Sequence, residues 1–286
     1  MLNYLRITRP INLIIIGITV VVLQWLVKTP LNGWSFESAL IVLKALVLVL
    51  VAAGGYVIND YFDQRADAIN KPKEQIVGVH LTGKRAILIH ILLSALALVF
   101  SFFLSHVYHN HFYWLMTLIL IFALLVYTPF FKRTVILGNV LVAAIVACLP
   151  WWALMDLVPT SLYSMVWAMV FFSFISNWIR EVVKDIQDVQ GDAVGQYRSI
   201  ALVKGIGAAS MVVKWAWLGL LVSVMVFHLF MVNPGQRIAL NLMVIPGFIG
   251  WFPTWIAKEP ADYKRIARLM KLWMILATAG FVLLFV

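Results

Sequence analysis

Long apolar runs recur along almost the whole chain, and they constrain its fold more than any other feature. A transmembrane helix needs about 20 consecutive apolar residues to cross a hydrocarbon core of roughly 30 Å. Hydrophobic residues make up 63% of the 286 residues and charged residues only 12%, a composition that soluble domains do not have. The sequence therefore predicts an all-α polytopic membrane protein whose single domain covers residues 1–286. The nine expected spans are 11–28, 36–59, 85–106, 112–131, 134–155, 162–179, 207–232, 238–257 and 267–286.

The distribution of basic residues predicts the orientation of these spans. The formal net charge is +10, and most Lys and Arg residues lie before the first span or in alternate connections. Two of those connections, about 61–84 and 180–206, are unusually long. If nine spans alternate, all the basic connections fall on the cytoplasmic side. We expect an integral cell-membrane protein with a cytoplasmic N-terminus. The net positive charge is then explained by the basic residues of the cytoplasmic connections, and it does not indicate a nucleic-acid partner.

Acidic residues crowd into two places, of which the first acidic stretch is residues 59–72. On a helix, Asn59, Asp63 and Asp67 follow one another at four-residue intervals, so their side-chain oxygens share one face. Asp60 lies beside them. This stretch directly follows an expected span, so we expect its oxygens to lie at the cytoplasmic end of that helix.

The second acidic stretch is residues 180–192, and it repeats the pattern far along the chain. Glu181, Asp185, Asp188 and Asp192 recur at spacings of four, three and four, which again places them on one helical face. The two stretches hold seven of the 12 acidic residues of the chain. Such crowding of like charge needs neutralising cations, and Mg²⁺ prefers carboxylate oxygens that it shares with substrate phosphates. The sequence therefore predicts Mg²⁺ as a cofactor.

Together the two stretches indicate a site for a lipid diphosphate. A metal ion at each stretch could bridge one diphosphate and neutralise the charge that grows as it leaves. The apolar bundle beneath would hold a long hydrocarbon chain, so a prenyl diphosphate fits both parts. Basic residues near the same mouth could contact the remaining phosphate oxygens. These residues are Arg65, Lys71, Lys132, Lys184 and Arg198.

Two other interpretations compete with this one. The acidic residues could be ordinary solvated helix faces, since Arg180 and Lys184 are spaced for salt bridges with them. They could instead line the pathway of a membrane cation or solute transporter. Their position beyond the span ends, rather than in the middle of a span, disfavours a transport pathway. Lys44 and Lys214 do lie within spans, and we expect them to snorkel or to pair inside the bundle.

The first acidic stretch resembles the first aspartate-rich motif of the UbiA-type intramembrane prenyltransferases, with Asn59-Asp60-x-x-Asp63-x-x-x-Asp67-x-x-Asn70-x-Pro72. The second stretch resembles their second motif, with Lys184-Asp185-Ile186-x-Asp188-x-x-Gly191-Asp192. Shorter similarities occur at Arg9-Pro10-x-Asn12 and at Tyr127 and Lys132, ahead of Gly138-Asn139. One departure follows Pro72, where Lys73-Glu74 stands in place of the Arg-Pro pair of many members.

The resemblance implies Mg²⁺-dependent transfer of a prenyl group from a prenyl diphosphate to a hydrophobic or phosphorylated acceptor. By residue, it implies that Asn59, Asp63 and Asp67 hold one metal, and that Asp188 and Asp192 hold the other. It places Asp60, Asp67, Tyr127, Lys132 and Asp185 in the catalytic machinery, and Arg9 and Asn12 beside the cavity. The stretch 132–139 and the form Lys184-Asp185-Ile186 are most similar to the branch that alkylates geranylgeranylglyceryl phosphate. The branch that alkylates an aromatic ring in quinone biosynthesis is the alternative.

Overall fold

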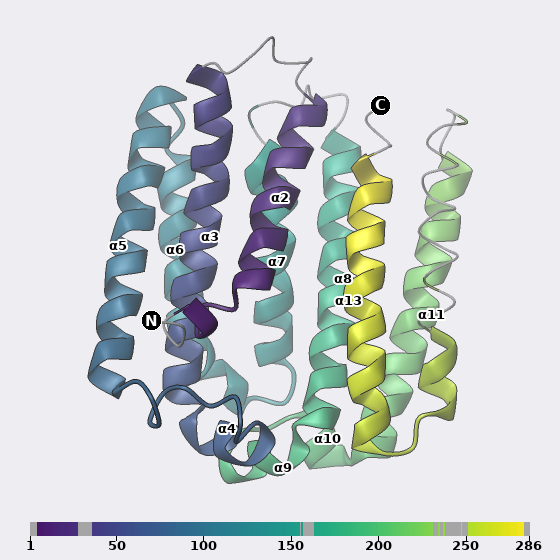
Figure 1. Ribbon diagram of the computed structural model, residues 1–286. Helices are drawn as coiled ribbons and strands as arrows, with labels where there is room; N and C mark the ends of the chain where they lie inside the picture. Colours follow the sequence, from purple (N-terminus) through teal and green to yellow (C-terminus); the bar gives the residue numbers. More distant parts are fainter. Residues whose placement is uncertain are drawn as a thin grey trace.

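The computed structural model describes residues 5–27, 36–154, 156, 163–230, 234, 237, 247 and 251–282, and these residues form an all-helical protein (Figure 1). Long helices stand side by side, and short helices pack across one end of them. The long helices are α2 (Pro10–Val27), α3 (Phe36–Phe62), α5 (Gly83–Val107), α6 (Phe112–Tyr127), α7 (Leu137–Leu154), α8 (Tyr163–Gln187), α11 (Ile206–Phe230) and α13 (Pro260–Val282). The short ones are α4 (Gln64–Asn70), η1 (Phe131–Arg133), α9 (Val189–Val194) and α10 (Ile200–Lys204).

Five of these helices, α3, α5, α7, α8 and α11, are long and apolar enough to cross a membrane. Helices α2 and α6 are apolar but shorter. Large apolar side chains stay exposed on the outside of the bundle, such as Phe102 and Phe122 at 67% and 63%, and such faces suit contact with lipid tails. The structure therefore confirms a polytopic helical membrane protein. The expected span 238–257 lies mostly outside the described residues, and α13 begins at Pro260, seven residues before the expected span.

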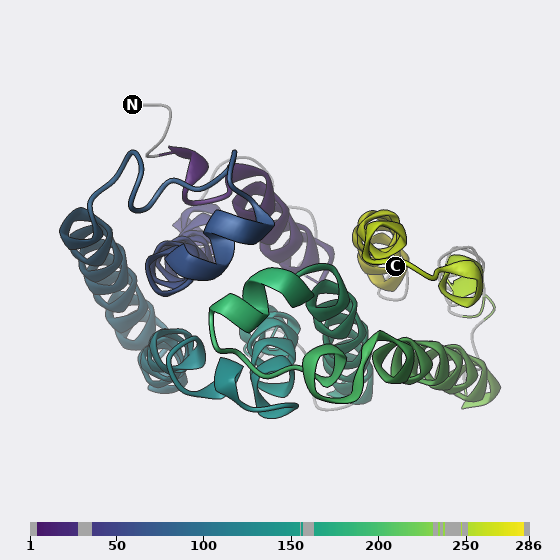
Figure 2. The ribbon, with the colours of Figure 1, turned by 90° about the horizontal axis from the view of Figure 1, so that it is seen from below.

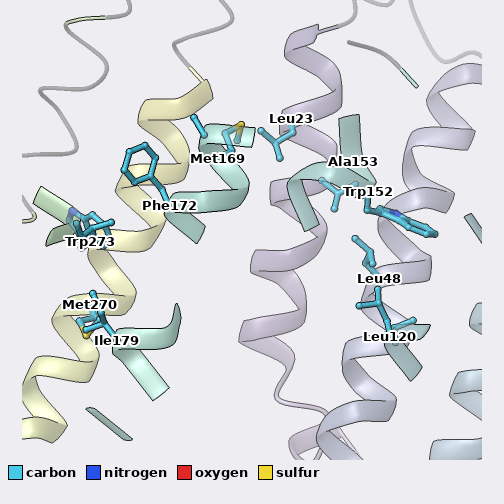
Figure 3. Close-up of a cluster of buried hydrophobic side chains, with 14 of the residues drawn as sticks. Leu23, Leu48, Leu120, Trp152, Ala153, Met169, Phe172, Ile179, Met270 and Trp273 are labelled. Atoms are coloured by element: carbon cyan, nitrogen blue, oxygen red, sulfur yellow. The ribbon is translucent and has the colours of Figure 1, made fainter. Parts of the chain in front are cut away.

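Helices α3 and α8 organise the bundle. Helix α3 packs against α5, α2 and α6, whereas α8 packs against α7, α11 and α13 (Figure 2). The buried apolar side chains follow these helices, and Figure 3 shows Trp152 next to Leu48 in one part of the core and Trp273 near Phe172 in another. These contacts place α3 and α8 on opposite sides of the space inside the bundle.

The two acidic stretches bend in the same way. Helix α3 ends at Phe62 and α4 starts at Gln64, so Asp63 is the junction, and Asp188 is the junction between α8 and α9. Helix-type backbone bonds cross both junctions, from Asp63 N to Asn59 O at 2.9 Å and from Asp188 N to Lys184 O at 2.9 Å. Each stretch therefore continues its long helix with a bend at an aspartate, and α4 and α9 then pack together across the end of the bundle.

The expected pairing of the lysines inside the bundle is confirmed. The Lys44 ammonium lies 2.6 Å from Asp156 Oδ2, which joins α3 to the end of α7. On α11, the Lys214 ammonium lies 5.1 Å from the ring centre of Trp255, where a cation–π contact stabilises it. Lys44 therefore has a carboxylate partner inside the bundle, whereas the partner of Lys214 is an aromatic ring.

Candidate active site

A cavity of about 270 Å³ connects the two acidic stretches with the middle of the bundle. Its polar end is formed by Asp63 and Asp67 from the first stretch and Asp188 and Asp192 from the second. Its other end is apolar. On α3 the lining runs from Asn59 to Leu48, eleven residues apart, which is about 16 Å of helix. The apolar lining consists of Ile16, Leu48, Val51, Ala52, Leu120, Leu124, Val142, Ile145, Val146 and Leu149.

Asp63 is the most heavily bonded acid of the site. One of its oxygens, Oδ2, accepts hydrogen bonds from Lys132 Nζ at 2.8 Å and from Asn59 Nδ2 at 2.9 Å, and Oδ1 accepts one from the Tyr197 hydroxyl at 2.6 Å. The Thr128 hydroxyl in turn donates to Asn59 Oδ1 at 2.7 Å. Although burial opposes the charge of Lys132, the nearby carboxylates of Asp63 and Asp192 raise its pKa. This network joins α3, η1 and the segment after α9, and it holds Lys132 charged at the cavity.

Arg9 and Asp60 form a second ion pair at the same end of the bundle. Arg9 Nη2 lies 2.7 Å from Asp60 Oδ1, and the guanidinium stands 4.8 Å from the ring centre of Tyr56. Arg9 has a backbone φ of 54°, a region that residues with a side chain rarely adopt. Strained conformations of this kind cluster at functional sites, where surrounding contacts hold them. Arg9 lines the cavity, as the resemblance implied, while Asp60 reaches it only through Arg9.

The α8 side of the cavity carries two carboxylates with partners, the buried Glu181 and the half-buried Asp185. Asp185 Oδ2 accepts a hydrogen bond from Asn139 Nδ2 at 2.7 Å. Glu181 pairs with Lys184 at 2.8 Å and with Arg180 at 3.0 Å. These contacts fix the side chains of α8 toward α7 and toward one another, so that α8 presents both signs of charge to the cavity.

Three carboxylates at the polar end have no such partner. In the described part of the chain, no side chain donates a hydrogen bond to the carboxylates of Asp67, Asp188 or Asp192. Burial and then the neighbouring Asp63 raise the pKa of Asp67 to about 6. Burial also raises the pKa of Asp192 to about 6, against the nearby charge of Lys132, which lowers it, and the repulsion of Asp188 adds to the rise. Partly buried carboxylates with spare oxygens are the donor set that suits a hard cation.

The acidic residues nevertheless do not form a ready-made metal cluster. Among the residues that the structure describes, no three His, Cys, Asp or Glu side chains are grouped so that they could hold a metal ion by themselves. The oxygens instead line two sides of one cavity, from α4 and from α9. The donor set therefore fits ions that share their ligands with a bound anion, as Mg²⁺ does with phosphates.

Comparisons with known proteins agree with this geometry. The model of the UbiA prenyltransferase family matches residues 16–275, which is most of the chain. The chain belongs to the UbiA prenyltransferase family. Among its relatives, the digeranylgeranylglyceryl phosphate synthase of Saccharolobus solfataricus is 31% identical over 193 residues, covering 64% of this chain and 63% of that protein. The match thus spans slightly less than two thirds of that relative. The synthase of Thermococcus gammatolerans is 27% identical over 98% of this chain and 97% of its own length.

Solved structures share the fold of this chain over nearly its full length. A structure of a digeranylgeranylglyceryl phosphate synthase has a TM-score of 0.71 at 20% identity and covers 98% of this chain and 96% of its own. A UbiA homologue from Archaeoglobus fulgidus, bound to GPP and Mg²⁺, has a TM-score of 0.70 at 18% identity, over 99% and 100% of the two chains. At these identities the likeness concerns the fold.

Within this UbiA fold, the cavity brings together most of the residues that the sequence singled out. Arg9, Asn12, Asn59, Asp63, Asp67, Lys71, Tyr127, Lys132, Lys184, Asp185, Asp188 and Asp192 all line it. Arg65 and Arg198 do not line it, and both are exposed. Arg198 instead donates its backbone N–H to the Lys132 carbonyl at 3.2 Å, next to the site.

Several residues of the site escaped the sequence analysis. Tyr197 carries no motif signal, yet its hydroxyl donates to Asp63 and its ring lies 4.2 Å below the Lys132 ammonium. Thr128 and Asn139 each hold a residue of an acidic stretch. Asn139 was visible only as part of a short similarity, and its bond to Asp185 depends on how α7 packs against α8.

Asn70 joins the two acidic stretches of this UbiA site directly. Its Nδ2 donates to the Asp188 carbonyl at 3.1 Å, and its Oδ1 accepts from Gly191 N at 2.9 Å. A Cβ on Gly191 would stand 2.3 Å from Asn70 Nδ2 and 2.5 Å from the Ala66 carbonyl, distances that real contacts do not reach. Only glycine therefore lets α9 approach α4 closely enough for both bonds.

We expect Gly191→Ala to separate the two acidic stretches and to lower turnover at least about tenfold, because a shift of about 1 Å at a reacting site can cost much of its rate. Steady-state kinetics of the purified variant measures this. Gly219→Ala on α11 is the matched control, since a Cβ there meets nothing within 4 Å. Unchanged turnover in Gly191→Ala would mean that the close approach of α4 and α9 does not matter for the reaction.

Proposed function

We propose that this chain transfers a prenyl group from a prenyl diphosphate to geranylgeranylglyceryl phosphate, with Mg²⁺ as the cofactor. One observation carries the proposal: a single cavity joins two facing carboxylate stretches to an apolar chamber. A diphosphate head needs the first part and a hydrocarbon tail needs the second. The named relatives, which are digeranylgeranylglyceryl phosphate synthases, and the homologue bound to GPP and Mg²⁺ support the same reaction class.

The metal-binding groups would be Asn59, Asp63 and Asp67 on one side and Asp188 and Asp192 on the other, with Asp185 in support. When bound, Mg²⁺ neutralises the charge that develops on the leaving diphosphate. The unpaired carboxylates of Asp67, Asp188 and Asp192 supply the charge that attracts it. Asp63 is shared with Lys132, so this acid links the metal-binding groups to a protein cation.

The cations of the chain then orient the diphosphate. Lys132, Lys71 and Lys184 line the cavity and can donate to phosphate oxygens. Arg9, held by Asp60, adds a positive charge directly before the start of α2. Arg65 and Arg198 are exposed, so they would act on the approaching anion over a distance.

The apolar chamber protects the reacting carbon. Departure of the diphosphate breaks the bond between its oxygen and the allylic carbon and leaves a cation, which the ring of Tyr127 can stabilise as a cation–π partner. The free hydroxyl oxygen of the acceptor then bonds to that carbon and releases its proton. Because the lining beyond Tyr127 is apolar, water is excluded and the acceptor captures the cation.

The topology that we propose places this chemistry at the inner leaflet. Nine spans, with the N-terminus in the cytoplasm, would form one domain over residues 1–286. Both acidic stretches and most basic connections then lie on the cytoplasmic side, which the positive-inside rule favours. Prenyl diphosphates are charged and would reach the cavity from that side.

A product assay tests the proposal. Purified protein receives Mg²⁺, a labelled prenyl diphosphate and one acceptor at a time: geranylgeranylglyceryl phosphate, hydroxybenzoate or dihydroxynaphthoate. We expect diphosphate release and an ether product with the first acceptor only. Turnover of an aromatic acceptor alone would assign the chain to quinone-type chemistry. Movement of a solute across vesicles, with the diphosphate intact, would make it a transporter.

A further inference from the structure

Tyr197 lies outside both acidic stretches, in the segment between α9 and α10, and it contacts the first stretch. Its hydroxyl donates a hydrogen bond of 2.6 Å to Asp63 Oδ1 and also lies 3.3 Å from the Phe62 carbonyl oxygen. These two acceptors mark the bend where α3 ends and α4 begins. Tyr197 itself is buried. A buried hydroxyl from beyond the second acidic stretch therefore holds the bend of the first.

The position of this hydroxyl is set by contacts on the rest of the residue. The Lys132 ammonium stands 4.2 Å from the ring centre of Tyr197, which is a cation–π distance. A Cβ on Gly195 would stand 2.8 Å from the ring, so the backbone passes the ring at the closest approach that glycine allows. The Tyr197 N–H donates to the Asp192 carbonyl at 2.9 Å. The fold thus aims the hydroxyl at Asp63.

The two carboxylate oxygens of Asp63 have different partners. Oδ2 accepts hydrogen bonds from Lys132 Nζ at 2.8 Å and from Asn59 Nδ2 at 2.9 Å. A carboxylate oxygen has about two lone pairs, so these two donors fill it. Among the residues that the structure describes, only the Tyr197 hydroxyl donates to Oδ1. Because Oδ1 keeps a lone pair, it is the oxygen through which Asp63 can hold a metal ion.

Lys132 can compete with a metal ion for this oxygen. An ammonium has three N–H donors, and the Lys132 ammonium uses one of them on Asp63 Oδ2. A carboxylate that is free to turn can give both its oxygens to one ammonium. The same chain shows this at Lys44, whose Nζ lies 2.8 and 2.6 Å from the two oxygens of Asp156. Asp63 in such a pair would offer a metal ion much less negative charge.

We propose that Tyr197 is a positioning residue for metal binding, whose hydroxyl keeps Oδ1 of Asp63 away from Lys132 and available to the ion. The inference rests on the proposed function in one respect, since it takes Asp63 as a metal ligand. Removing a group that hydrogen-bonds to a metal ligand typically lowers metal affinity by about 10- to 100-fold. Because Tyr197 follows α9, the first metal site then depends on the packing of α9 against α4.

Binding of Mn²⁺ tests this inference without the reaction. Mn²⁺ takes the same kinds of oxygen ligand as Mg²⁺, and its electron paramagnetic resonance signal reports the bound ion directly. The full chain in detergent is titrated with Mn²⁺ in the presence of inorganic diphosphate, with neither donor nor acceptor. Tyr197→Phe keeps the ring and removes the hydroxyl. We expect its apparent Mn²⁺ affinity to fall about tenfold or more. An affinity equal to that of wild type would overturn the inference.

Tyr263→Phe is the matched control. It removes a buried hydroxyl from α13 that has no hydrogen-bond partner within the described part of the chain. Its Mn²⁺ affinity should equal that of wild type, and a loss as large as that of Tyr197→Phe would contradict the proposal. A purely structural role for Tyr197 would lower the melting temperature of Tyr197→Phe and leave the Mn²⁺ affinity unchanged, which also contradicts it.

A second background tests the competition with Lys132. Lys132→Met keeps the length of the side chain and removes its charge. In this background Tyr197→Phe should change the Mn²⁺ affinity little, because no ammonium remains to take Oδ1 of Asp63. The same loss with and without Lys132 would overturn the inference, since Tyr197 would then not act by keeping the two groups apart.

The binding experiment also separates this inference from the proposed function. If wild type binds Mn²⁺ more tightly than Tyr197→Phe but forms no prenylated product, only the proposed function fails. If wild type transfers the prenyl group and the two proteins bind Mn²⁺ equally, only the inference fails. A wild type that binds no Mn²⁺ under these conditions contradicts the metal-binding role of Asp63, and the inference falls with it.

Discussion

Replacing Asp188 by alanine should lower the rate of prenyl transfer about 100-fold or more, and Asp63→Ala should do the same, because each removes negative oxygens from the polar end of one cavity. The two residues stand 125 positions apart in the chain, yet they occupy the same kind of bend, one after α3 and one after α8. Asp188→Asn should be nearly as damaging, since it keeps the size of the side chain and loses its charge.

The structure makes Asp188 the cleaner of the two tests. Its carboxylate has no hydrogen-bond partner in the described residues, so its removal should leave folding intact. Asp63→Ala also removes the hydrogen-bond acceptor of Lys132 and Tyr197. Asp63→Asn is therefore the better variant at this position. Glu74→Ala removes an exposed acid from the first long connection and serves as the control.

Single-turnover rates at saturating Mg²⁺, with the melting temperature of each variant, measure the effect. The double variant should lose much less than the product of the two single losses, because groups that act as a unit are not additive. Normal turnover in a folded Asp188→Ala protein would contradict the metal-binding role. The second acidic stretch would then be an ordinary solvated helix face.

Replacing Asp156 by alanine should destabilise the fold by about 3 kcal/mol or more, because it leaves a buried ammonium without its carboxylate. Lys44 is fully buried, and its Nζ lies 2.8 and 2.6 Å from the two oxygens of Asp156. The Tyr113 hydroxyl also donates to Asp156 at 2.7 Å, and the Lys44 ammonium stands 4.1 Å from the ring centre of Tyr108. This cluster joins α3, α6 and α7 at the end of the bundle opposite the acidic stretches.

Thermal unfolding in detergent measures this loss as a lower melting temperature. Adding Lys44→Met to Asp156→Ala should recover much of it, since the buried charge is then gone as well. Glu259→Ala removes an exposed acid before α13 and is the control. A melting temperature of Asp156→Ala equal to that of wild type would show that Lys44 does not depend on Asp156.

The apolar pattern predicted most of the fold because few backbone structures can span a membrane. Backbone groups in lipid must be bonded within their own helix, so each long apolar run becomes a helix wherever it is placed. The same periodicity placed Asn59, Asp63 and Asp67 on one face, and the cavity lining confirms that face. What periodicity could not predict was the bend at Asp63 and Asp188, because both bends depend on the packing of α4 against α9.

The sequence by itself determined an all-helical membrane chain, the two acidic stretches and their kinship with the UbiA family, since these follow from composition and spacing along one helix. Only the tertiary structure decided which partners those acids have. Tyr197 on Asp63 and Asn139 on Asp185 are contacts between segments far apart in the chain. Such contacts arise from how helices rotate and pack against one another, and local spacing holds no information about that rotation.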